Sequence, residues 1–237
     1  MGSDLKGMAS DLAVLSDSEA TDPNYQSNDY ADLLINDSTN EVLESYHCFD
    51  RLYPASITKV MTALLTLEHG NMDDEITLKH DINLTENGAV ISTLTKGDTV
   101  TVGQVFHTML IKSANDCAVI LAEYVAGSES KFIDMMNAKA KELGATHTHF
   151  VNPNGLHDNN HYTTAYDLYL IFKEAVKYDT FVDTVSSKDY TMTYTTPKKT
   201  QINEYMQSTN YYLLNEFPVP EGVVCLLYTS PSPRDTR

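Results

Sequence analysis

The amino-acid sequence predicts an α/β protein in which a cluster of helices packs on an antiparallel sheet. Three observations support this fold class. Between Pro54 and Gly70 the apolar residues cover more than one stripe of a helix, which predicts a helix buried on most sides. Amphipathic helical patterns then recur between Thr101 and Val176. Short runs with strand composition lie before, within and after this helical block.

Short runs with the composition or alternation of β-strands span residues 30–35, 41–46, 75–78, 88–93 and 189–196. The first two are separated by Asn, Asp, Ser and Thr, which favour turns, so together they predict a hairpin. The next two lie among turn residues and predict a small lobe or an excursion from the domain. Residues 146–151 are also predicted to be extended, and they end at a strong turn signal over residues 152–155.

The helical block contains two sequences of the capping-box type, in which a Thr is followed three residues later by a Gln or an acid. Thr101 with Gln104 begins one predicted helix, and Thr164 with Asp167 begins another. Two more helices, each ended by a glycine, are predicted over residues 115–126 and 130–143. We interpret Asp167 as a helix-capping acid rather than a catalytic one.

The chain is strongly acidic, with a formal net charge of −17 at pH 7. This argues against a nucleic-acid partner and against an anionic membrane surface, since both need clustered Lys and Arg. No apolar run approaches the roughly 20 residues of a membrane-spanning helix. Residues 1–27 lack the basic start and apolar centre of a signal peptide. Either the protein is cytoplasmic, or its true N-terminus lies outside this sequence.

The sequence divides into three parts. Residues 1–28 are rich in Ser, Asp, Ala and Gly and are expected to be a flexible leader. Residues 29–224 hold the predicted helices and strands and are expected to form one domain. Residues 225–237 change character abruptly, because Pro, Ser and Arg follow an apolar start without periodicity. We interpret this tail as a translated adapter or vector sequence, with a natural disordered C-terminus as the alternative.

Two polar residues, Ser56 and Lys59, lie at the start of the predicted buried helix. Three residues apart, they project from one helix face about a turn from each other. A serine hydroxyl is a weak nucleophile at neutral pH, and a desolvated lysine beside it can take its proton. The alternative is a helix that begins with Ser and carries a solvated Lys. The four-residue pattern alone favours that alternative, since it recurs at Ser3–Lys6 and Ser128–Lys131.

A second short pattern, Ser113-Ala114-Asn115, interrupts two predicted helices. Its simplest explanation is structural, with Ser113 as the helix cap and Asp116 closing a capping box. The same Ser-x-Asn spacing recurs at residues 38–40 and 208–210. By itself, therefore, this tripeptide is as unspecific as the first.

Taken together, these elements resemble the D-alanyl-D-alanine carboxypeptidases among the low-molecular-weight penicillin-binding proteins, which have the serine β-lactamase-like fold. The S-x-x-K element is a signature of that class. The resemblance covers about residues 30–224, and its motifs occur in the order of the family. The matching stretches are residues 53–65 (YPASITKVMTALL), 110–116 (LIKSAND), 150–156 (FVNPNGL) and 162–168 (YTTAYDL).

The resemblance implies a role for each candidate residue. Ser56 would attack the carbonyl of the penultimate D-alanine in a peptidoglycan stem peptide, and Lys59 would accept its proton. Ser113 would relay a proton to the leaving D-alanine, helped by a nearby amine. Asn115 would bind the substrate amide and help to hold Lys59. Water would then hydrolyse the acyl-enzyme, and β-lactam antibiotics would acylate the same serine. The Ser56 N–H would form half of an oxyanion hole.

One family motif is absent from the sequence. Family members carry a Lys-Thr-Gly on a strand that lines the site. The only similar run, Lys199-Thr200-Gln201, lacks the glycine that lets substrate approach the backbone, and it lies too early in the chain. The tail begins where the strand is due. We therefore expect C-terminal sheet strands to be missing and leave open whether this chain is active. The resemblance also implies an extracytoplasmic location, secreted or at the cell envelope.

Two rival functions follow from the same residues. A serine β-lactamase would share Ser56, Lys59 and Ser113, but a class A enzyme also needs a deacylating glutamate, and residues 152–166 contain none. A catalytically impaired fragment that binds penicillin or peptidoglycan is the other alternative.

The remaining candidates are histidines and cysteines. His157 and His161 have the spacing of metal ligands on a helix, but they lie in a predicted loop without a third ligand. His147 and His149 are expected to be solvated, and no metal or cofactor is expected. Cys48, Cys117 and Cys225 are too few for a disulfide framework and are predicted to be buried thiols.

Overall fold

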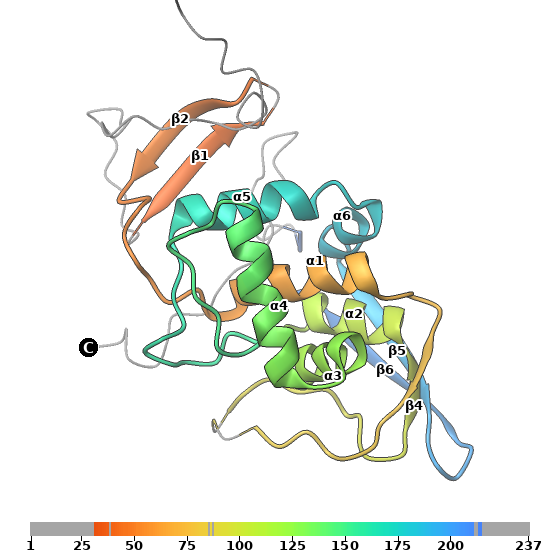
Figure 1. The fold of residues 1–237 in the computed structure, drawn as a ribbon. Helices are drawn as coiled ribbons and strands as arrows, with labels where there is room; N and C mark the ends of the chain where they lie inside the picture. The colour runs from red at the N-terminus through yellow and green to blue at the C-terminus, as the bar shows by residue number, and fades with distance from the viewer. Residues whose placement is uncertain (1–30, 38, 85, 87, 211–212, 215–237) are drawn as a thin grey trace, which may run out of the picture.

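The computed structural model describes residues 31–37, 39–84, 86, 88–210 and 213–214. A cluster of helices lies between a short hairpin and a larger antiparallel sheet (Figure 1). This arrangement confirms the predicted fold class. The expected leader over residues 1–28, the tail over residues 225–237 and Cys225 all lie outside the described residues.

The strands form two separate antiparallel sheets. Strands β1 (Asp32–Asn36) and β2 (Glu41–Tyr46) pair as the predicted hairpin, which lies beside α5 in Figure 1. The second sheet has the order β3-β4-β5-β6. Its strands are β3 (Glu75–Thr77), β4 (Thr99–Thr101), β5 (Asp189–Thr195) and β6 (Gln201–Gln207). Strand β6 was not predicted, because its polar residues hide the partial burial of Ile202, Glu204 and Met206 on one face.

The helix that begins at Lys59 is the centre of the fold. It is α1 (Lys59–His69), preceded by a single 3₁₀ turn, η1 (Ala55–Thr58). The helices α2 (Val102–Ile111), α3 (Asn115–Ala126), α4 (Glu129–Glu142) and α5 (Ala165–Ala175) all contact it. Because neighbours surround α1, every residue from Lys59 to Thr66 is buried, the polar Lys59, Thr62 and Thr66 included. A short further helix, α6 (Asp179–Val185), was not predicted.

The two predicted capping boxes are each half formed. Thr101 accepts from the Gln104 N–H at 3.3 Å and Thr164 from the Asp167 N–H at 3.0 Å, as predicted. The reciprocal bonds are replaced by tertiary ones. The Gln104 side chain accepts from the Thr193 N–H, and the Asp167 carboxylate accepts from His147 N–H and Thr148 Oγ1. The interpretation of Asp167 as a capping acid was therefore wrong for its side chain, which joins α5 to the chain at residues 147–148.

The predicted strand at residues 88–93 is a loop instead. Its backbone N–H groups are taken by carboxylates: Ser92 donates to Asp116, and Thr93 donates to Glu204. The predicted extended run at residues 146–151 pairs only at His149 with Tyr162 among the described residues. In both runs, backbone N–H groups donate to side chains of other segments instead of to a neighbouring strand, so the local strand propensity is overridden.

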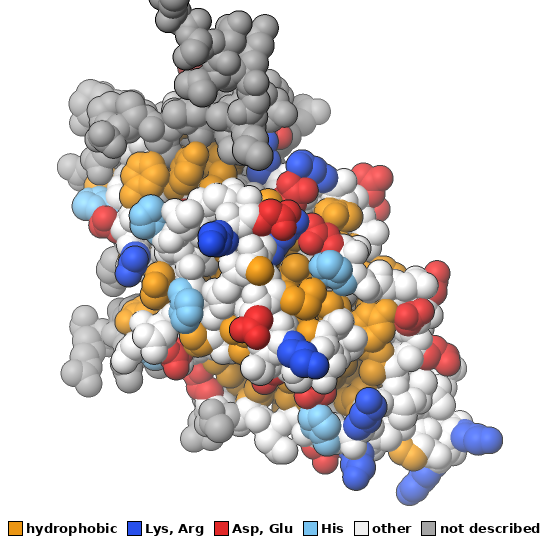
Figure 2. Space-filling model, in the orientation of Figure 1, with side chains coloured by type: hydrophobic (Ala, Val, Ile, Leu, Met, Phe, Trp, Pro, Cys, Tyr) orange, Lys and Arg blue, Asp and Glu red, His pale blue; other side chains and the backbone are white. Residues whose placement is uncertain are grey.

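Acidic and basic side chains are interspersed over the face shown in Figure 2, with apolar side chains between them. Cys48 and Cys117 are buried, as predicted, with 4% and 0% of their surface exposed. Within the described residues, no helix is long and apolar enough to cross a membrane.

Candidate active site

The amine of Lys59 has three polar partners, the predicted nucleophile among them. Its Nζ lies 3.1 Å from Ser56 Oγ, 2.9 Å from Asn115 Oδ1 and 2.7 Å from the main-chain oxygen of Asn154. Lys59 is only 1% exposed. The structure therefore brings three of the four predicted site residues, Ser56, Lys59 and Asn115, into direct contact and adds Asn154, which no sequence pattern indicated.

Whether each partner of Lys59 can donate or only accept a hydrogen bond determines the direction of the lone pair on a neutral Lys59 amine. The oxygens of Asn115 and Asn154 can only accept hydrogen bonds. The amide of Asn115 is oriented, because its Nδ2 donates to the Val90 carbonyl at 3.0 Å. A neutral amine has two N–H bonds, and these two oxygens use both. The lone pair is then directed at Ser56 Oγ, as a general base requires.

Burial lowers the pKa of Lys59 from 10.5 to about 7, although Cys117 and Asp116 act in the opposite direction. Removing an ammonium group from water disfavours its charged form, which is the reason for this shift. At neutral pH a large fraction of Lys59 is consequently an uncharged amine. An ordinary solvated lysine would be almost wholly protonated under the same conditions.

Ser56 lies in the 3₁₀ turn that precedes α1, rather than in α1 itself. The residue before it, Ala55, has a φ of 46°, in the left-handed region that alanine rarely adopts. Strained backbone of this kind persists only where its surroundings hold it, and it is frequent at functional sites. The tertiary contacts of the turn therefore matter for the position of the Ser56 hydroxyl.

Ser113 has the other notable backbone at the site, with a φ of 60°. It is not the cap of α3, because that position belongs to Ala114. Nor does Asp116 close a capping box, since its carboxylate accepts from the N–H and Oγ of Ser92. The structural explanation of the Ser-x-Asn tripeptide was therefore wrong. Ser113 is half-buried at the turn between α2 and α3, two residues before Asn115.

The turn at residues 152–155 closes over the start of α1. Its Pro153 carbonyl accepts from Thr62 Oγ1 at 2.6 Å, and its Asn154 carbonyl accepts from Lys59. Gly155 has a φ of +87°, and a Cβ there would lie 1.8 Å from the Ala55 oxygen. Only glycine fits this position. The turn signal was visible in the sequence, but its contact with the Ser56 segment was not.

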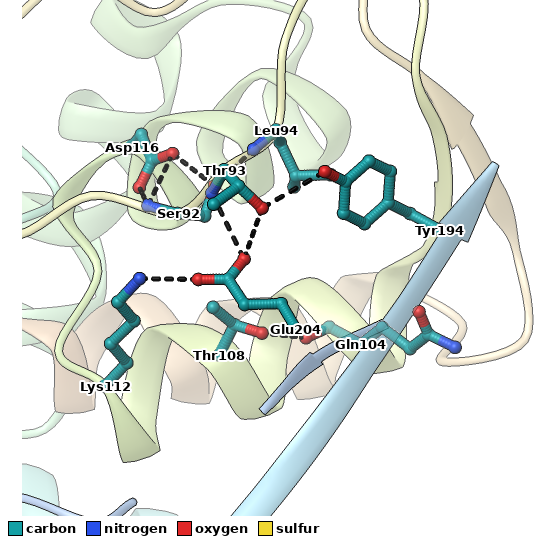
Figure 3. Close-up of polar contacts among 9 residues, drawn as sticks. All are labelled: Ser92, Thr93, Leu94, Gln104, Thr108, Lys112, Asp116, Tyr194 and Glu204. Atoms are coloured by element: carbon teal, nitrogen blue, oxygen red, sulfur yellow. Dashed lines mark hydrogen bonds and ion pairs between the residues drawn. The ribbon is translucent and has the colours of Figure 1, made fainter. Parts of the chain in front are cut away.

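A polar network ties the rim of the site to the sheet (Figure 3). Glu204 of β6 accepts from Lys112 Nζ at 2.6 Å through one oxygen, and from the Thr93 N–H at 3.2 Å and Oγ1 at 2.5 Å through the other. Burial acts to raise the pKa of Glu204, but the hydrogen bonds from Lys112 and Thr93 outweigh it and hold that pKa below its usual value. Since Lys112 directly precedes Ser113, this network anchors the turn that carries Ser113.

The similar run Lys199-Thr200-Gln201 is placed elsewhere. Lys199 and Thr200 lie in the exposed turn between β5 and β6, Lys199 with a φ of 60°, and Gln201 is the first residue of β6. Within the described residues, no group of three or more His, Cys, Asp or Glu side chains could hold a metal ion.

Comparison with known proteins agrees with this geometry. The sequence model of the D-alanyl-D-alanine carboxypeptidase family, Peptidase_S11, matches residues 17–216. The chain belongs to this family of serine peptidases. Ser56, Lys59 and Asn115, which meet at the N-terminal end of α1, all lie within the matched residues.

Individual relatives support the same assignment. The chain is 34% identical to the D-alanyl-D-alanine carboxypeptidase DacF of Bacillus subtilis (strain 168) over 81% of its own length and 49% of the relative's. It is 32% identical to DacC of Escherichia coli (strain K12) over 75% of its length and 46% of the relative's. The chain thus spans about half the length of the curated family members it matches.

Solved structures extend the similarity to the fold. A mutant of the Streptomyces K15 DD-transpeptidase superposes with a TM-score of 0.73 at 28% identity, covering 77% of this chain and 75% of the other. The S11 family member described here therefore has the DD-peptidase fold, within the wider β-lactamase-like class.

Proposed function

We propose that the parent protein is a serine-type D-Ala-D-Ala carboxypeptidase, which removes the terminal D-alanine from peptidoglycan stem peptides through an acyl-enzyme on Ser56. The observation that carries this proposal is the buried Lys59 amine beside Ser56 Oγ, with its two other partners able only to accept. This arrangement suits proton abstraction from a serine hydroxyl at neutral pH.

The reaction would proceed in two steps. In acylation, Ser56 Oγ attacks the carbonyl carbon of the penultimate D-alanine while its proton passes to the Lys59 amine. The C–N bond then breaks, and the proton held by Lys59 passes through Ser113 to the leaving D-alanine nitrogen. In deacylation, Lys59 takes a proton from the water that attacks the ester and returns it to Ser56 Oγ as the ester bond breaks, which releases the shortened peptide. Lys59 ends each cycle in its original protonation state.

Asn115 would support this reaction mainly by orienting Lys59. Its Oδ1 holds the amine, while its backbone N–H and Nδ2 both bind the Val90 carbonyl, at 2.8 and 3.0 Å. A substrate amide would have to compete with Val90 for Nδ2. The inferred substrate contact of Asn115 is therefore weaker in this arrangement than its contact with Lys59.

β-Lactams are proposed to acylate Ser56, because their strained amide presents a carbonyl carbon to the same nucleophile. The proposed location is extracytoplasmic, where peptidoglycan lies. The sequence contains no Lys-Thr-Gly, so substrate carboxylate recognition by this chain is the weakest part of the proposal.

The test is covalent labelling of the 237-residue chain with a fluorescent penicillin, alongside D-alanine release from a D-Ala-D-Ala peptide and hydrolysis of nitrocefin. We expect labelling that is lost in Ser56→Ala, with slow nitrocefin turnover. Labelling without D-alanine release would identify a penicillin-binding fragment. Fast nitrocefin turnover would identify a β-lactamase. No labelling of a folded sample would refute acylation by this chain.

A further inference from the structure

His161 is a buried histidine that the proposed reaction does not use. It is 2% exposed, and both of its ring nitrogens have protein partners. Nδ1 lies 3.1 Å from the Val151 backbone nitrogen, and Nε2 lies 2.7 Å from Thr58 Oγ1. In the sequence, His161 stands out only by its metal-ligand spacing from His157.

These partners fix the protonation state of the ring. The Val151 N–H can only donate, so Nδ1 must accept and carries no proton. In the neutral imidazole the proton is then on Nε2, which donates to Thr58 Oγ1. A doubly protonated ring would place an N–H against the Val151 N–H. Burial lowers the pKa of His161 to about 4, with Asp158 acting to raise it and His149 and His157 acting to lower it.

The two partners of His161 belong to the two segments that hold the reactive amine. Thr58 immediately precedes Lys59, in the turn that carries Ser56. Val151 leads into the turn at residues 152–155, whose Asn154 carbonyl accepts from Lys59 at 2.7 Å. The imidazole thus bridges the start of α1 and the segment that presents a carbonyl to its first residue.

We propose that His161 is a positioning residue for Lys59, whose neutral ring ties Val151 to Thr58 and so keeps the Asn154 carbonyl against the Lys59 amine. This inference rests on the proposed function for its catalytic meaning, but its geometry can be tested without turnover. If the His161 hydrogen bonds to Thr58 and Val151 are lost, the Asn154 carbonyl moves away from Lys59, and the ammonium form of Lys59 loses one acceptor. The pKa of Lys59 would then fall, because hydrogen bonds to an ammonium group favour its protonated state.

The variant that removes both bonds while keeping a ring in place is His161→Phe. The variant His161→Gln keeps one donor and one acceptor. The matched control is His147→Phe, because His147 is exposed on the same stretch of chain. In each protein the pKa of Lys59 is measured by NMR from its ¹³C-labelled side chain, with the resonance assigned by its loss in Lys59→Arg. The other charged or titratable groups that influence Lys59 are Cys117 and Asp116, and every variant retains both.

We expect His161→Phe to lower the protonation constant of Lys59 by about threefold to tenfold, as when one charge-assisted hydrogen bond weakens. His161→Gln and His147→Phe should stay close to the unchanged chain. An unaltered Lys59 pKa in His161→Phe would overturn the proposal. A raised pKa would overturn it too, since it would mean that the ring only keeps water from Lys59.

Two further measurements separate other outcomes. If His161→Phe does not fold, Thr58→Val removes the hydroxyl partner with little change of shape, and an unchanged Lys59 pKa there would overturn the proposal. Above about pH 7, where protonation of Lys59 no longer limits the rate, penicillin labelling should be slower in the same variants, because the amine is less well positioned. If the unchanged chain is not labelled at all, the proposed function fails, while the NMR comparison still decides the role of His161.

Discussion

Gly155 lies directly against the carbonyl of Ala55, so closely that a Cβ would come within 1.8 Å of its oxygen and 3.0 Å of Thr58 Oγ1. Ala55 is the strained residue before Ser56. A glycine far along the chain therefore allows the loop that binds Lys59 to cover the turn that carries the nucleophile.

Gly155→Ala should displace this loop and abolish labelling of Ser56 by a fluorescent penicillin. We expect a loss of roughly 3 kcal/mol or more in the free energy of unfolding, because backbone rather than a flexible side chain blocks the added methyl group. The control is Gly127→Ala, whose φ is +77° but whose Cβ would meet nothing within 4 Å. It should cost only about 1 kcal/mol and keep labelling. Equal effects of the two substitutions would show that backbone strain alone matters.

The lowered pKa of Lys59 predicts the pH dependence of acylation. A base must be uncharged to act, so the rate constant for labelling should be constant above about pH 7 and decline below it, following protonation of Lys59. The decline should approach about tenfold per pH unit once Lys59 is mostly protonated. Lys59→Arg should not be labelled at any of these pH values, since arginine stays charged. A rate that is independent of pH between 5 and 8 would exclude Lys59 as the base.

The ion pair of Lys112 with Glu204 predicts a stability coupling across the network in Figure 3. We expect a double-mutant cycle of Lys112→Met and Glu204→Gln to give a coupling of about 1–3 kcal/mol in denaturant unfolding, since the side chains are 28% and 12% exposed. The same cycle on the more exposed pair of Lys177 and Glu174 should give below about 0.5 kcal/mol.

The sign of the pH effect follows from Glu204. Its pKa is lower in the folded chain, so its contribution is complete above the ordinary carboxyl pKa and is lost as the pH falls through the folded value. The coupling should therefore be present at pH 7 and shrink in acid. If the coupling stays constant as the pH falls below the ordinary carboxyl pKa, the ionised Glu204 is not the source of the coupling with Lys112.

The lowered pKa of His161 predicts a second loss of stability, at a pH higher than that at which Glu204 is protonated. Its pKa is about 4 in the folded chain and about 6.5 in an unfolded one. The unfolded chain binds the proton more readily, so stability falls as the pH drops from 6.5 towards 4, by at most about 3 kcal/mol. Above pH 6.5 this group has no effect. In His161→Gln the unfolding free energy should vary less over this interval. An identical pH dependence in the two proteins would disprove the expected contribution.

Much of the fold was predictable because it depends on local pattern. The apolar stretch after Pro54 and the glycines after α3 and α4 carry their own signals of length and end. The predictions failed where a side chain from a distant element took over a backbone group. Ser92 and Thr93 donate to Asp116 and Glu204, so a run with strand composition became a loop. Nothing within residues 88–93 indicates those acceptors.

From the residues alone one could assign the family, the fold class and the pairing of Ser56 with Lys59, because a spacing of three residues places two side chains on one face of a helical turn whatever surrounds them. The packing of distant segments around α1 is what buries Lys59, places Asn115 and the Asn154 carbonyl against its amine, and through burial lowers its pKa to about 7. Desolvation and hydrogen-bond partners come from segments far apart in the chain, and a sequence pattern records neither.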